Sequence, residues 1–133
     1  MAGTGAQDDI RAVFDQLLEA QNAGDAERVR SRLSERSDAV HIGTDADKWW
    51  TSKQIVDAVA AVGGPDEIQA VADDIDIHVQ SDVAWVEGRG RFTRAGGGER
   101  PVRMTGVFVR EDGQWKVAQS HASIGVPNDD IFG

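Results

Sequence analysis

Side chains able to exchange a proton near neutral pH are few in this chain. The histidines are His41, His78 and His121, and the sequence holds no cysteine and no tyrosine. An imidazole titrates near neutral pH, and His121 stands two residues before the hydroxyl of Ser123. His121 is therefore a candidate for giving a proton to a ligand or orienting its carbonyl group, with Ser123 as a candidate ligand contact.

The same inventory excludes several familiar kinds of site. Without cysteine the chain has no thiolate nucleophile, no disulfide and no Cys-ligated zinc. The histidines lie outside the spacings that hold zinc, such as HExxH. The glycine-rich stretches at 88–90 and 95–98 do not stand between a strand and a helix, as a phosphate-binding loop requires. We therefore predict no metal and no cofactor.

Carboxylates and a guanidinium complete the polar candidates. With His121, the acidic residues Asp45 and Glu87 are our candidates for proton transfer. Arg103 offers the two-pronged donor that matches a ligand carboxylate, unless an acidic residue of the chain pairs with it. His41 is a further candidate for contact with a ligand.

Two adjacent tryptophans, Trp49 and Trp50, precede a predicted helix. Aromatic rings at such a place close over an apolar ligand, although packing explains them equally well. Adjacent side chains rarely face the same way, so we expect one ring in the core and the other near a pocket. Thr51 caps the helix and fixes the residue before it, which favours Trp50 as the pocket residue.

Helical periodicity is confined to the first half of the chain. Apolar residues with the spacing of one helical face predict three helices. The first spans 8–22, the second begins at Asp25, and the third follows a capping box formed by Thr51 and Gln54. The segment 38–44 alternates and predicts a short strand between the second helix and the third.

From residue 65 onward the pattern changes to alternation. Strands are predicted over 68–80, 83–94, 100–110 and 114–126, separated by turn-forming pairs and glycines. Helices followed by such a meander predict an α+β domain, in which a curved antiparallel β-sheet wraps around three N-terminal helices.

Length and charge limit the organisation and the partners. A chain of 133 residues fits one domain, for which we predict the bounds 8–126, with a flexible tail at 1–7 and a second tail at 127–133. Lys and Arg total 14 against 23 Asp and Glu, and the formal charge of -9 repels a phosphate backbone, so no nucleic acid partner is expected. No stretch reaches the roughly 20 apolar residues of a membrane span and no secretion signal is recognisable, so we expect a cytoplasmic protein with no membrane partner.

Three stretches carry a resemblance to a known family: IGTDADKWWTSKQI at 42–55, DVAWVEGRGRF at 82–92, and RMTGVFVREDGQWKVAQSHASIG at 103–125. With the order of the predicted elements, they resemble the SnoaL-like branch of the nuclear transport factor 2-like superfamily, to which the ketosteroid isomerases also belong. The resemblance implies a cone-shaped sheet, a ligand cavity between its concave face and the helices, and a homodimer through the outer sheet surface.

The residues that carry catalysis in such relatives are missing from this chain. In the ketosteroid isomerases an Asp acts as the base, and a Tyr with a protonated Asp forms the oxyanion hole. Here the position that matches the base is Gly43, and the stretch 104–106 holds no carboxylate. The dehydratases of the superfamily also rely on Tyr, which this chain lacks.

The resemblance leaves three functions open. The first is a cofactor-free binding protein for a small, largely apolar or carboxylated molecule. The second is an isomerase, dehydratase or cyclase that uses general acid and base residues in the same cavity. The third is an assembly domain without a ligand.

The face of the last strand that lines the cavity is also open. Alternation places His121 and Ser123 on one face, and Ala118 and Ala122 on the other. A β-bulge would exchange the two faces. On the outer face, His121 would be a hydrogen-bonded histidine at a dimer surface rather than a ligand contact.

Overall fold

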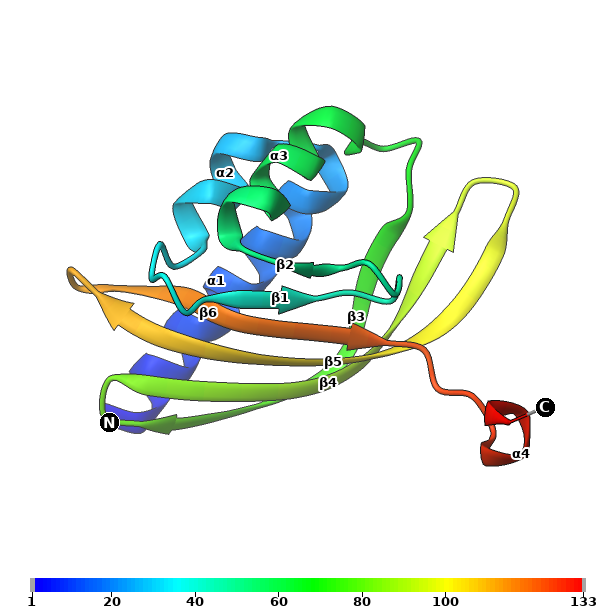
Figure 1. The fold of residues 1–133 in the computed structure, drawn as a ribbon. Helices are drawn as coiled ribbons and strands as arrows, with labels where there is room; N and C mark the ends of the chain where they lie inside the picture. The colour runs from blue at the N-terminus through cyan, green and yellow to red at the C-terminus, as the bar shows by residue number, and fades with distance from the viewer. Residues whose placement is uncertain (1, 133) are drawn as a thin grey trace.

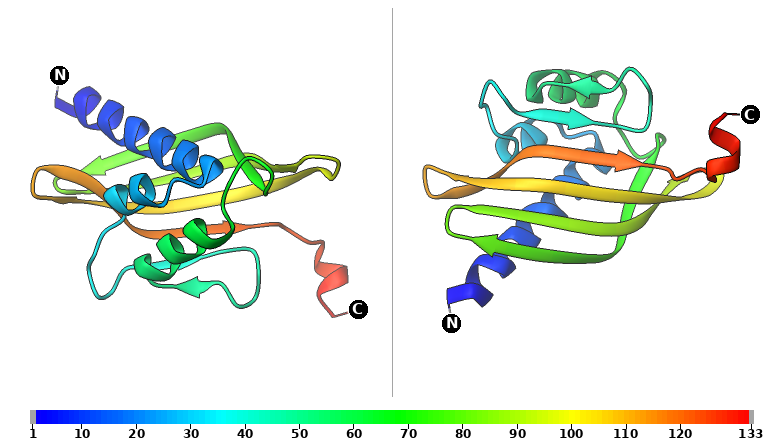
Figure 2. Two further views of the ribbon diagram at one scale, coloured as in Figure 1. Left: turned by 90° about the horizontal axis from the view of Figure 1, so that it is seen from above. Right: turned by 60° about the horizontal axis from the view of Figure 1, so that its bottom comes forward.

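The computed structural model describes residues 2–132 and shows helices lying on one side of a curved six-stranded sheet (Figure 1). The helices are α1 (Ala2–Ala23), α2 (Ala26–Arg32), α3 (Ser52–Val62) and the short α4 (Asn128–Ile131). In Figure 2 the first three cover the concave face of the sheet, whereas α4 stands away from it. This arrangement confirms the predicted α+β fold class.

Local sequence signals set the helix ends. The left-handed backbone of Gly24 (φ +73°) ends α1, and the Asp25 side chain then accepts a hydrogen bond from the Arg28 amide at the start of α2. The predicted capping box of Thr51 and Gln54 is formed at the start of α3. The first helix, however, begins at Ala2, so residues 2–7, predicted as a tail, continue α1.

The sheet has the strand order β2-β1-β6-β5-β4-β3 and is open at both edges. Its strands are β1 (Val40–Ile42), β2 (Trp49–Trp50), β3 (Gln69–Gln80), β4 (Val83–Arg94), β5 (Gly98–Glu111) and β6 (Gln114–Ser123). Strands β3 to β6 form the predicted antiparallel meander. The sheet as a whole is mixed, because β1 runs parallel to β6. The tryptophan pair forms the two-residue strand β2, at a place where the sequence predicted no strand.

The core lies where the concave face of the sheet meets the helices. Phe108, Val117 and Trp115 from the last two strands are buried against Ile10 of α1 and Val29 of α2. Burial of these apolar side chains is the main favourable term that holds the helices to the sheet. No helix within residues 2–132 is long and apolar enough to cross a membrane.

A β-bulge in β6 determines which of its side chains face the helices. Val107 of β5 pairs with Gln119, and Phe108 pairs with Val117, so Ala118 is an extra residue without a partner. The bulge exchanges the two faces: Val117 points inward before it, and Ser120 points inward after it. His121 therefore has an exposed side chain on the convex side.

Candidate functional site: a cavity on the concave face

A cavity of about 390 Å³ lies between the concave face of the sheet and the helices α1 and α3. Most of its lining side chains are apolar and come from both layers of the fold, including Phe14, Leu17, Ile55, Val59, Phe92 and Met104.

The hairpin of β1 and β2 supplies one wall of this cavity. His41 pairs with Trp50 and Ile42 pairs with Trp49, and the Gly43 amide donates to the Lys48 carbonyl at 2.9 Å, which extends the pairing by one residue. Alternation along paired strands therefore places His41, Trp50 and Lys48 on the cavity side. All three line the cavity.

The same alternation places Trp49 on the other side of the hairpin, with 70% of its surface exposed. The expectation that one ring of the tryptophan pair lies in the core is therefore wrong. The core tryptophan is Trp115 of β6. The reason is that β2 lies at the sheet edge, where its outward side chain stays exposed.

His41 is the most buried polar group of the cavity wall, with 3% of its surface exposed. Its Nδ1 lies 2.8 Å from Ser120 Oγ and its Nε2 lies 3.0 Å from Ser52 Oγ. The Ser52 hydroxyl donates to the Ser34 carbonyl at 2.7 Å, so its oxygen accepts from His41 Nε2–H. A neutral His41 then accepts the Ser120 hydroxyl proton at Nδ1.

Electrostatics favour this neutral form. Burial of the ring lowers the pKa of His41 below its ordinary value of 6.5. The imidazole is therefore uncharged at neutral pH, and both of its nitrogens are used within the chain. Toward the cavity, Ser120 Oγ therefore offers acceptor capacity and no donor.

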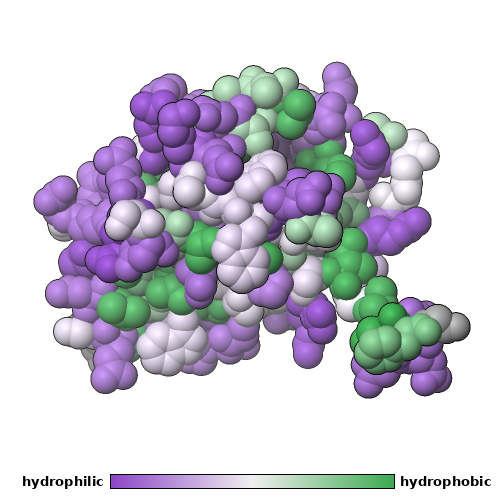
Figure 3. Space-filling model, viewed as in Figure 1, coloured by the Kyte–Doolittle hydropathy of each residue, from purple (hydrophilic) through white to green (hydrophobic). Residues whose placement is uncertain are grey.

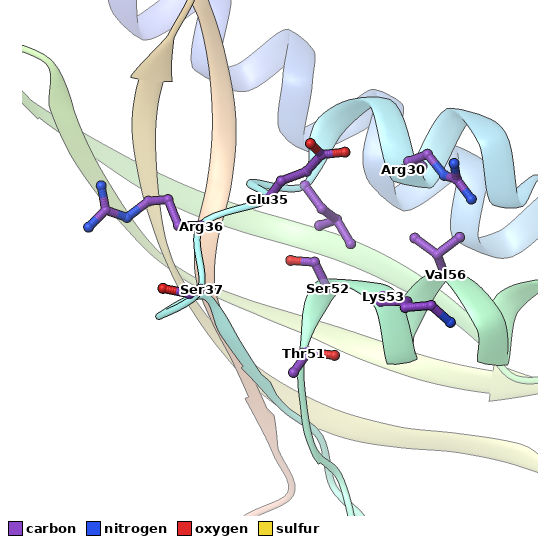
Figure 4. Close-up of a pocket in the computed structure, with 9 residues that line it drawn as sticks. Arg30, Glu35, Arg36, Ser37, Thr51, Ser52, Lys53 and Val56 are labelled. Atoms are coloured by element: carbon purple, nitrogen blue, oxygen red, sulfur yellow. The ribbon is translucent and has the colours of Figure 1, made fainter.

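A second hollow, of about 520 Å³, lies outside the cone near the start of α3 (Figure 4). Its cationic side chains are already paired with carboxylates: Arg36 with Asp38 at 2.8 Å and Lys53 with Asp57 at 2.8 Å. We therefore place the candidate site in the cone. Ser52 lines this outer hollow, so the bonds Ser120–His41–Ser52 connect the two spaces.

The other predicted site residues are spread over different parts of the fold. Glu87 lies on the convex face and accepts from His78 Nε2 at 2.8 Å. Arg103 lies on the same face, where its Nε donates to Ser123 Oγ at 3.2 Å. Asp45 is exposed in the turn between β1 and β2, and its Oδ1 accepts from the Asp47 amide.

The structure therefore does not bring the proton-transfer candidates together. His121 adjoins the cavity along β6, but its exposed side chain shares the convex face with Glu87. Asp45 belongs to a turn at the far edge of the sheet. No three His, Asp or Glu side chains among residues 2–132 gather closely enough to hold a metal ion.

Several polar residues of the cavity wall were absent from the sequence candidates, among them Ser120 and Lys48. Ser120 was not recognised, because the bulge at Ala118 decides its direction. Lys48 lies two residues before Trp50, so in a strand the two side chains point to the same face. If β2 had been predicted as a strand, this spacing would have identified Lys48 as a residue of the cavity wall.

Comparisons with known proteins agree on the fold. A SnoaL-like domain model matches residues 10–127. A nuclear transport factor 2-like protein from Salmonella enterica serovar Typhimurium has a TM-score of 0.80 at 16% identity, covering 98% of this chain and 99% of that one. No protein of curated function matches the sequence.

Two further solved structures show the same fold under other names. A protein from Streptomyces avermitilis, provisionally named a dehydratase of the NTF2-like family, has a TM-score of 0.77 at 21% identity and covers 96% of this chain and 100% of that one. A protein from Xanthomonas campestris, provisionally named a calcium/calmodulin-dependent protein kinase II association domain, has a TM-score of 0.71 at 21% identity. The match covers 90% of this chain and 86% of that one. At these identities the likeness concerns the fold alone.

Proposed function

The chain belongs to the SnoaL-like domain family, and from that premise we propose that it binds a small, largely apolar or carboxylated molecule in the concave cavity. The observation that carries this proposal is the cavity itself, about 390 Å³ with mainly apolar side chains around it. Ligand sites of proteins typically span about 300–1,000 Å³ and are lined in this way, with a few polar groups that orient the ligand. The volume suits a molecule with one or two rings, or a medium-length hydrocarbon chain.

A cavity-filling variant tests this proposal. Ala58 lines the cavity from α3, whereas Ala60 is exposed on the same helix. The probes are 2-naphthalenemethanol and 1-octanol, titrated by calorimetry. We expect Ala58→Trp to abolish binding and Ala60→Trp to retain it, with both variants folded by circular dichroism. Equal binding by the two variants, or no binding of either probe to the parent protein, would overturn the proposal.

A second candidate function, general acid and base catalysis in the same cavity, is favoured by the inward pair of Ser120 and His41. Isomerases, dehydratases and cyclases all remove a proton next to a carbonyl group. Here Ser120 Oγ would take that proton while its own passes to Nδ1 of His41 at 2.8 Å. One structural neighbour with this fold carries a dehydratase name, although this chain lacks the Tyr on which the dehydratases of the superfamily rely.

Proton exchange tests this candidate without knowledge of the natural substrate. The methyl protons of 2-acetonaphthone, which lie next to its carbonyl, are followed by NMR in D2O. We expect the protein to accelerate their exchange and both Ser120→Ala and His41→Gln to remove the acceleration. An exchange rate equal to that of buffer would reject catalysis and leave the binding function standing.

We also infer a cytoplasmic homodimer that associates through the convex face of the sheet. Trp85 and Val83 support this inference, because they lie exposed on β4 on a face that no helix within residues 2–132 covers (Figure 2). Figure 3 shows apolar residues between hydrophilic ones over the strands. The structural neighbour named as a kinase association domain also favours assembly as a function of this fold.

A further inference from the structure

We propose that Lys48 makes the cavity selective for ligands that carry a carboxylate, which it binds at the cavity mouth. This inference rests on the proposed binding function and adds the class of ligand. Lys48 lies in the cavity lining, in the turn between β1 and β2.

The backbone and the stem of Lys48 are both held in place. Its amide donates to the Asp45 carbonyl at 2.9 Å, and its carbonyl accepts from the Gly43 amide at 2.9 Å. A Cβ at Gly43 would lie 2.8 Å from Cδ of Lys48, so the lysine stem occupies the space that a side chain at 43 would need. Because Gly43 has no side chain, the stem of Lys48 has room to lie along the cavity wall.

The ammonium group ends beside an aromatic ring of the same wall. Nζ lies 5.7 Å from the centroid of the Trp50 ring, within the range of a cation–π contact. A ligand that packs an apolar body against Trp50 therefore brings a terminal carboxylate next to this ammonium. Lys48 and Trp50 together form a contact for a molecule with one apolar part and one anionic end.

Among the residues that line the cavity, Lys48 carries the positive charge that an anion needs. The charged residues of the cavity lining are Lys48 and Glu67. Within residues 2–132 no carboxylate lies at ion-pair distance from the Lys48 ammonium, whereas Lys53 is paired with Asp57. Glu67 belongs to the loop before β3, at the opposite edge of the sheet from β2, and repels an anion toward the Lys48 side.

The deep polar spot cannot replace Lys48 in this role. Both ring nitrogens of His41 are bonded to serine hydroxyls, and the Ser120 hydroxyl is used as a donor to Nδ1. This spot offers an acceptor to a ligand and no donor, so a carboxylate there would remain buried without a partner, at a large desolvation cost. A carboxylate is therefore bound at the mouth, with the apolar part of the ligand inward.

Matched acids and alcohols test the proposal. The probes are 2-naphthoate against 2-naphthalenemethanol and octanoate against 1-octanol, titrated by calorimetry at pH 7 and low salt into the full chain. Lys48 is exposed, so each acid is expected to bind about two- to fivefold tighter than its alcohol, the gain of a solvent-exposed charge pair at low salt. Lys48→Met should bind each acid no tighter than its alcohol. Lys48→Arg should retain the preference.

The control is Lys53→Met, which removes the same charge from α3 outside the cone and should keep the preference for acids. Equal affinities of acid and alcohol for the parent protein, or a preference that survives in Lys48→Met, would overturn the role of Lys48 while leaving the binding function intact. Failure of all four probes to bind would overturn both.

Discussion

Ser120 Oγ lies 2.8 Å from Nδ1 of His41, and the two residues are direct partners in the parallel pairing of β6 with β1. Their bond exists because of the bulge at Ala118, which turns Ser120 to the concave side. On the other side of the ring, Ser52 connects His41 to the start of α3. One buried imidazole therefore ties the sheet edge, the cavity wall and a helix together.

We predict that neutral His41 makes stability depend on pH. Burial lowers the pKa of His41 below 6.5 in the folded chain, so the unfolded chain takes up this proton first as pH falls. The stability that neutral His41 contributes is complete above pH 6.5 and is lost as pH falls from there toward the lowered folded pKa. Urea unfolding between pH 8 and pH 5 measures this loss of stability. As pH falls, the free energy of unfolding should decrease more steeply for the parent protein than for His41→Gln. Parallel profiles of the two proteins would contradict the prediction.

Much of the fold is predictable from this sequence because its signals are local. The capping box is a contact between Thr51 and Gln54, three residues apart, and it fixes the start of α3 wherever the helix packs. The turn at Asp112 and Gly113 likewise joins β5 to β6 within a few residues, with both in left-handed backbone. Alternation between such turns is enough to predict four strands of the sheet.

The candidate site is less predictable because it depends on contacts between distant segments. The direction of Ser120 follows from pairing with β5, where one extra residue in β6 exchanges the two faces. The direction of Lys48 follows from the pairing of two very short strands, which leaves no periodicity to detect. Neither strand pairing can be predicted from the spacing of residues along one segment.

We predict that Trp50 and Trp49 differ in their effect on ligand affinity. Trp50→Ala removes part of an aromatic contact, and at about 25 cal/mol per Å² this costs on the order of 1–2 kcal/mol, about tenfold in affinity. Trp49→Ala removes an equally large ring on the outer side and should leave affinity unchanged. Calorimetry with 2-naphthalenemethanol and thermal unfolding of both variants provide the check. Unchanged affinity with a large loss of stability in Trp50→Ala would show a purely structural ring.

We predict that Asn22 ties the start of β3 to the end of α1. Its Nδ2 donates to the Ala70 carbonyl at 2.9 Å, and its Oδ1 accepts from the Ala70 amide at 2.8 Å. Asn22→Ala leaves both half-buried groups unpaired and should cost about 1–3 kcal/mol in the free energy of unfolding by urea. The exposed Gln16→Ala serves as the matched control with little effect. Equal stabilities of the two variants would show that water replaces the Asn22 bonds at no cost.

The last prediction concerns the convex face, where the ring of Trp85 stacks on His78 with 5.5 Å between centroids and remains 43% exposed. Stable interfaces bury about 800 Å² per partner around a few aromatic anchors, and Trp85 of β4 is an exposed ring on this face. Trp85→Glu places a charge there and should convert a dimer to a monomer in light scattering at micromolar concentration. Val62→Glu, which adds the same charge to an exposed site on α3, should leave the mass unchanged. A monomeric parent protein would contradict association through the sheet.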